Sequence, residues 1–110
     1  MAKGKYIKDK KVTILENKGG RDENGFPIDD MQPIEGGQNI WAYYRHASAN
    51  EFYGAAAVNV EVEVIFKINW RDDLKYDMKI EYKGEQYGIT RIDDFEGYKK
   101  DLTIYAYKLN

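Results

Sequence analysis

One stretch of this 110-residue chain alternates apolar and polar side chains, and this pattern constrains the fold more than any other feature. Residues 58–70 read VNVEVEVIFKINW, in which the side chains at every second position are apolar: Val58, Val60, Val62, Val64, Phe66, Ile68 and Trp70. A period of two is that of a β-strand with one buried and one wetted face, and it excludes a helix. The sequence therefore predicts one strand over residues 58–70. Such a strand would run roughly 40 Å, so we expect it to bend and serve two sides of a barrel.

Shorter alternating segments predict five further strands, at residues 11–17, 39–45, 78–82, 86–92 and 102–109. Gly84 supplies the turn of a hairpin between the third and fourth of these, and the polar residues 93–101 form the next connection. Ser48 and Glu51 have the spacing of a capping box, which predicts one short helix within residues 48–57. The expected fold is therefore all-β: a small antiparallel six-stranded β-barrel or sandwich with one short helix.

A long segment between the first two expected strands, residues 18–37, has neither helical nor strand periodicity. Loops of this length in a compact domain are uncommon, and they are usually functional or disordered. We expect a mobile loop over residues 18–38. It is acidic, since residues 18–37 carry two cations and five carboxylates, a net charge of −3, whereas residues 1–11 carry five lysines and one aspartate, or +4. The lysines predict a basic flexible arm over residues 1–9.

Composition narrows the function classes. The length predicts one domain over residues 1–110, and 43 % hydrophobic and 15 % aromatic residues indicate a folded chain. The absence of cysteine excludes disulfides and zinc–thiolate sites, and His46 is the only histidine, so a multi-histidine metal site is excluded too. A net charge of −2 argues against general nucleic-acid binding. No apolar run is long enough for a membrane span or a signal peptide, so we expect a cytosol-like compartment.

Two groups of carboxylates have residue types found in metal or acid–base sites, but turns explain both groups better. Counting from Asp22, the twelfth position of a calcium loop is Pro33 instead of glutamate, which argues against calcium. The pairs at 72–73 and 93–94 lie beside predicted turns, where aspartate is expected without any acid–base role. We therefore predict no catalytic residue, no metal site and no cofactor.

Aromatic residues on the strands leave one alternative open, a small barrel of the oligonucleotide-binding type that stacks single-stranded nucleic acid. These residues are Trp41, Tyr43, Tyr44, Phe66, Trp70 and Tyr82. Phe66 and Trp70 share the valine face of their strand, and the opposite face carries two glutamates, which favours a place in the core. Trp41 and Tyr43 alternate out of phase with their neighbours, so we expect them to be exposed and to form a protein interface.

The order of these motifs resembles that of the head-tail joining family of tailed bacteriophages, also called head-closure, stopper or head-tail adaptor proteins. The resemblance extends over residues 10–109. It is carried by Trp41-Ala42, by Glu51, by the strand end Ile68-Asn69-Trp70, and by the hairpin residues Ile80, Tyr82, Gly84, Tyr87 and Ile89. One position departs from the family pattern: Asn69 stands where an arginine is usual, which removes any salt bridge of that arginine.

The resemblance implies a connector protein of a phage or prophage particle. Such a protein assembles as a ring beneath the portal and its adaptor, receives the tail, and lets double-stranded DNA pass without sequence-specific binding. A related tail-completion protein is the neighbouring alternative. Residues implied for the assembly and channel loop are Arg21, Asp22, Glu23, Asn24, Gly25, Phe26, Asp29 and Asp30. Those predicted for a subunit or partner interface are Trp41, Tyr43, Arg45 and Glu51. The expected location is the virion, and the bacterial host cytoplasm during assembly.

Overall fold

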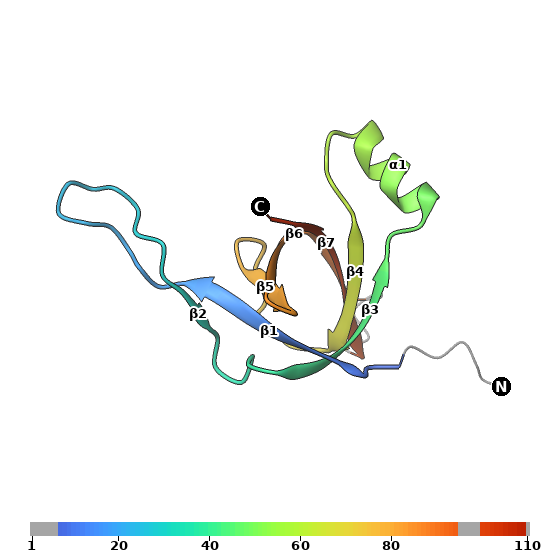
Figure 1. Ribbon diagram of the computed structural model, residues 1–110, viewed down its shortest axis with the longest axis horizontal. Coiled ribbons are helices and arrows are strands. Elements are labelled where there is room, and N and C mark those ends of the chain that lie inside the picture. Colours follow the sequence, from blue (N-terminus) through green and yellow to red (C-terminus); the bar gives the residue numbers. More distant parts are fainter. Residues whose placement is uncertain (1–6, 95–99, 110) are drawn as a thin grey trace.

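Six strands close into an antiparallel barrel in the computed structural model, which describes residues 7–94 and 100–109 (Figure 1). Around the barrel the order is β1 (Lys10–Asn17), β3 (Ile40–His46), β4 (Val64–Asn69), β7 (Asp101–Lys108), β6 (Glu85–Asp93) and β5 (Lys79–Tyr82). Pairing of β5 with β1, in the register Ile14 to Ile80, closes the ring of strands. The predicted six-stranded antiparallel barrel is confirmed.

The barrel interior is filled by alternate side chains of every strand. Fully buried examples are Ile14, Phe66, Ile80 and Ile104, each 0 % exposed. At one end Tyr44, Phe66, Tyr82 and Tyr87 form an aromatic cluster, with ring centroids 4.7 Å apart for Tyr44 and Tyr82 and 5.4 Å apart for Phe66 and Tyr87. Of the hairpin residues that carry the family resemblance, Ile80, Tyr82, Tyr87 and Ile89 are core residues.

The turn of the β5–β6 hairpin is the one that the sequence predicts. Lys83 and Gly84 both have positive φ, at 53° and 78°, and they connect strands whose last pair is Tyr82 with Glu85. Two consecutive left-handed residues match the right-handed twist of the flanking strands, and the second is a glycine, which adopts this conformation without steric cost.

The strand predicted over residues 58–70 is much shorter than expected, since β4 begins only at Val64. The helix α1 (Ala49–Ala57) extends up to this segment, and Val58 is its C-cap. Asn59 then reverses the chain with a φ of 64°, and the amide of Val60 donates to Ala55 O at 3.1 Å. These contacts at the end of the helix use the first residues of the alternating segment. The prediction of one bent strand that serves two sides of the barrel is therefore wrong.

The short helix is confirmed together with its capping box. The Ser48 hydroxyl accepts from the Glu51 amide at 3.2 Å, and Glu51 Oε1 accepts from the Ser48 amide at 2.8 Å. The helix is longer than one turn, and none of its residues is buried. It therefore stands against the outside of the barrel and does not belong to the core (Figure 1).

Most of the expected basic arm and of the polar connection after β6 lies outside the described residues, which exclude positions 1–6, 95–99 and 110. Where the described chain begins, Lys8 Nζ lies 2.9 Å from Asp101 Oδ1, so this lysine is bound to the start of β7.

Candidate functional site

The segment without periodicity in the sequence forms a long hairpin that projects beyond the barrel (Figure 1). Its return leg contains an additional strand, β2 (Met31–Pro33), which pairs with the end of β1. The ladder continues outward: Lys18 N donates to Asp30 O and Ile28 N to Gly20 O, both at 2.9 Å. Residues 18–30 are called the hairpin arm below. The expectation that residues 18–37 contain no strand is therefore wrong, while the mobility of the arm stays a prediction.

The tip of the hairpin arm is folded around one carboxylate. Asp22 Oδ1 accepts from the amides of Asn24 and Phe26, both at 2.9 Å, and Arg21 Nη1 donates to Gly25 O at 2.7 Å. An aspartate that satisfies the backbone of its own turn is the usual reason for aspartate at this place. The explanation of residues 22–25 as a turn is thus supported over the calcium loop.

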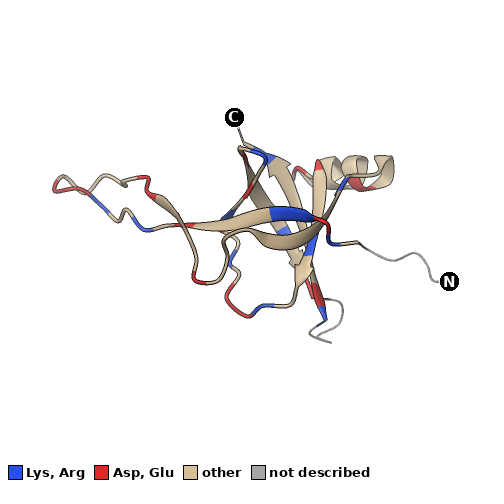
Figure 2. Cartoon of the chain, turned by 60° about the horizontal axis from the view of Figure 1, so that its bottom comes forward, with Lys and Arg blue, Asp and Glu red and all other residues tan. Residues whose placement is uncertain are grey.

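The hairpin arm has no buried residue, and all of residues 20–30 are exposed. Two large apolar side chains near its tip have no core to enter: Phe26 is 65 % and Ile28 41 % exposed. Around them lie the four carboxylates Asp22, Glu23, Asp29 and Asp30, and with Lys18 and Arg21 the arm has a net charge of −2 (Figure 2). An exposed apolar pair within an acidic surface is typical of a site that contacts another protein.

Arg71 fastens the turn that follows β2 to the barrel. Its guanidinium donates to Gly36 O at 2.7 Å, to Glu35 O at 2.8 Å and to both carboxylate oxygens of Asp73, at 2.9 and 2.8 Å. These charge-assisted hydrogen bonds hold the pKa of Asp73 below its usual value. Sequence reasoning missed Arg71, because its partners lie 35 and 36 positions away and only folding brings them together.

Trp41 is exposed as predicted, at 54 %, whereas its neighbour Ala42 is fully buried. Lys11 Nζ lies 4.5 Å from the centroid of the indole ring, a cation–π contact between β1 and β3. Trp41 also lines a hollow of about 350 Å³ together with Trp70 and Arg71. Tyr43 is half-buried on the same face of β3. The role of both side chains as an interface stays a prediction.

The structure pairs the other two predicted interface residues with each other. Arg45 on β3 donates to both carboxylate oxygens of Glu51 on α1, at 2.6 and 2.8 Å. This contact and the cap on Ser48 lower the pKa of Glu51 to about 2. We call the pair the Arg45–Glu51 clamp. The clamp holds α1 against the barrel, and its contact with a partner stays a prediction.

One carboxylate of each pair that acid–base chemistry would need is engaged in an ion pair. Asp73 binds Arg71, and Asp93 Oδ2 lies 3.5 Å from Arg91. Across residues 7–94 and 100–109, no group of three or more His, Asp or Glu side chains is arranged to hold a metal ion. In the same part of the chain, no helix is long and apolar enough to cross a membrane.

Most of the aromatic residues that would stack nucleic acid lie in the core or pack against it. Tyr82 and Tyr87 are 6 % and 7 % exposed, and Phe66 is fully buried. Trp70 is half-buried and packs against the core. Trp41 is the exposed ring of this set. The predicted place in the core is therefore confirmed for Phe66, while Trp70 lies at the edge of the core.

Comparison with known proteins agrees with the barrel and with the motifs. The chain is similar to the solution structure of protein SF1141 from Shigella flexneri 2a, with a TM-score of 0.75, 19 % identity and 96 % of each chain covered; at this identity the likeness shows the fold alone. No curated protein matches the chain. The family model described as phage head completion protein matches residues 8–108. Because the match spans nearly the whole sequence, the chain belongs to the phage head completion protein family and has a structural role in the head–tail region of a bacteriophage particle.

Proposed function

We propose that this protein assembles as a ring between the portal, or its adaptor, and the tail, where it closes the filled head and provides the tail attachment site. The proposal places it in the virion, after assembly in the host cytoplasm, with the portal or adaptor and a tail protein as partners. The observation that carries it is the hairpin arm: the barrel closes by its β1–β5 pairing without any contribution from residues 18–30.

An arm with no buried residue adds nothing to the apolar core of the single chain. Its exposed Phe26 and Ile28 gain contacts only when another surface meets them. Assembly into a ring is the event that supplies such surfaces, and any order that the arm gains is then provided by its partners.

The charge of the arm suits a position near a DNA channel. The four carboxylates of the arm outnumber its two cations, Lys18 and Arg21. A ring of such arms presents one sign of charge to the phosphate backbone and repels it, so that DNA can pass without being bound. This arrangement agrees with passage of double-stranded DNA in the absence of sequence-specific contacts.

A shortened arm tests the proposal. Residues 19–29 are replaced by Asn-Gly, which joins the pair formed by Lys18 and Asp30 through a two-residue hairpin turn. A larger deletion that reaches residue 34 would also remove β2 and the buried Ile34, whose amide donates to Ile14 O at 2.9 Å. The shorter variant therefore leaves the barrel intact.

We expect the variant to unfold at the temperature of the unaltered chain, and to give heads that lose DNA or fail to accept tails. The measurements are thermal unfolding, DNA retention in purified heads, and plaque titre with the variant as the sole copy. Full infectivity with a folded variant would refute the proposed role of the arm.

A further inference from the structure

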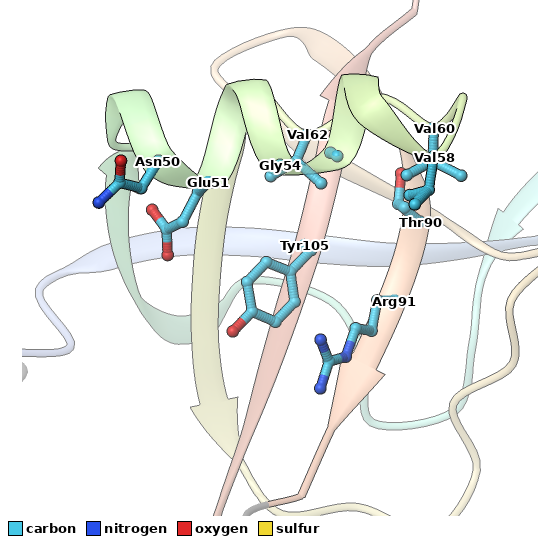
Figure 3. Close-up of a pocket in the computed structure, with 10 residues that line it drawn as sticks. Asn50, Glu51, Gly54, Val58, Val60, Val62, Thr90, Arg91 and Tyr105 are labelled. Atoms are coloured by element: carbon cyan, nitrogen blue, oxygen red, sulfur yellow. The ribbon is translucent and has the colours of Figure 1, made fainter.

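A groove of about 500 Å³ separates the helix α1 from the barrel (Figure 3). Asn50, Gly54 and Ala55 of the helix line one wall, and Tyr105 of β7 and Arg91 of β6 line the other. The remaining lining residues are Glu51, Val58, Val60, Val62 and Thr90. The volume falls within the range of roughly 300–1,000 Å³ that is typical of sites for small ligands and anchoring side chains.

The groove is held open by the way the helix is attached. The Arg45–Glu51 clamp fixes the first turn of α1, while Gly54 presents no side chain, and a Cβ built there would meet no atom within 4 Å. Across the groove, Tyr105 stands in register with Ile65 and Arg91 on the outer face of the barrel. The wall with Tyr105 and Arg91 is therefore built on rigid strands, and the opposite wall is a helix whose first turn is fixed.

The valine segment, residues 58–62, borders this groove and has the sequence of a strand without being one. Val58 and Val60 are 69 % and 42 % exposed, although their alternation with Asn59 and Glu61 is that of a half-buried strand. In the part of the chain that the structure describes, residues 58–62 pair with no strand. A partner segment laid over the turn at Asn59 would cover both valines.

The tip of the hairpin arm has the complementary pattern. Phe26 and Ile28 are two exposed apolar side chains on one leg of the arm, and Val58 and Val60 are two exposed apolar side chains beside the groove, so that each pair can cover the other. Charge agrees as well: the carboxylates at positions 29 and 30 follow Ile28, and Arg91 in the groove has a side chain that is 65 % exposed. Its ion pair with Asp93, at 3.5 Å, is long.

The hairpin arm and α1 lie at opposite ends of the molecule in both views of the chain (Figures 1 and 2). A chain therefore cannot place its arm in its own groove. Building on the ring proposed above, we infer that the arm tip of one copy docks in the groove under α1 of the next copy, with Phe26 and Ile28 against Val58 and Val60. Such a contact is head-to-tail, and repetition of a head-to-tail contact generates a closed ring when the rotation closes.

Cross-linking tests the contact directly, because the chain contains no cysteine. One preparation carries Phe26→Cys and another carries Gly54→Cys, both at open positions. The two are mixed on portal-bearing heads and treated with a short bismaleimide. We expect a covalent dimer from the mixture and none from either variant alone. Phe26→Cys mixed with Tyr76→Cys is the control, since Tyr76 is 61 % exposed and lies outside both surfaces.

Binding to heads gives a second readout. The double variant Phe26→Ser/Ile28→Ser removes the two apolar anchors, and it should raise the concentration that half-saturates the heads on the order of a hundredfold. The variant Val58→Ser/Val60→Ser should do the same from the groove side. Tyr76→Ser should bind as the unaltered chain does.

The outcomes separate this inference from the proposed function. Rings of unaltered stoichiometry that give no Phe26–Gly54 cross-link, or that bind equally well after the serine substitutions, would overturn the arm-to-groove contact and leave the connector role standing. An unaltered chain that neither binds heads nor forms a ring would overturn the proposed function, and the contact with it.

Discussion

Neutralising Glu51 separates the electrostatic part of the Arg45–Glu51 clamp from the rest of the helix. In Glu51→Gln the amide still supports the capping box, because glutamine serves at this position as glutamate does. The charge that faces Arg45 at 2.6 and 2.8 Å is lost. The variant therefore reports mainly on the ion pair between β3 and α1.

The size of the effect follows from the pKa. A decrease in the pKa of Glu51 from 4.5 to about 2 corresponds to an upper limit of roughly 3 kcal/mol. Because the side chains of Arg45 and Glu51 are 36 % and 26 % exposed, water screens the pair, and we expect about 1 kcal/mol. For a domain of this size such a loss lowers Tm by roughly 4–8 °C.

The effect has a defined pH dependence. A carboxylate whose folded pKa is lowered stabilises the protein fully above its unfolded pKa, and this contribution disappears as the pH falls through the folded pKa. The free energy of unfolding of Glu51→Gln should therefore be lower than that of the unaltered chain at pH 7. The difference should shrink below pH 4.5 and vanish near pH 2.

Urea unfolding at pH 7, 4 and 2.5 measures this difference. The matched control is Glu23→Gln, which removes the same charge at the exposed arm tip and should change the free energy of unfolding by less than about 0.5 kcal/mol. A destabilisation by Glu51→Gln that is equal at all three pH values, or absent at pH 7, would refute this account of the clamp.

Four further substitutions probe the fold by unfolding measurements. Gly37→Ala places a Cβ 2.5 Å from the buried side chain of Ile34 and should lower the free energy of unfolding by about 1–3 kcal/mol. Gly54→Ala meets open space in a helix and should raise the free energy of unfolding by about 0.5–1 kcal/mol. Changes in the same direction for both variants would contradict this. Arg71→Lys cannot keep the forked contacts to the backbone of residues 35 and 36, and it should cost about 1–2 kcal/mol and speed amide exchange in that turn, which unchanged exchange would disprove. Phe66→Ala empties a fully buried site and should cost about 3–5 kcal/mol, so that a loss below 1 kcal/mol would show that the core collapses around it.

Local patterns were sufficient for the elements whose residues lie close together in the chain. The β5–β6 hairpin depends on Gly84 and the alternation on either side of it, and the start of α1 depends on Ser48 and Glu51, three positions apart. The exposed position of Trp41 follows from the period of its own strand. Turn geometry, capping and alternation are properties of a few neighbouring residues, so the sequence determines them without the rest of the fold.

Contacts between distant segments were decided by the tertiary structure alone. The alternation of residues 58–70 is that of a strand, yet α1 and the reversal at Asn59 take its first part away from the barrel. Arg71 and the backbone of residues 35–36 meet only because the barrel closes. The polar segment before β2 has no periodicity, and it becomes a hairpin because β1 offers its backbone as a template. Periodicity specifies which side chains share a face, but the partner of that face is chosen by long-range packing and hydrogen bonding, which no local pattern encodes.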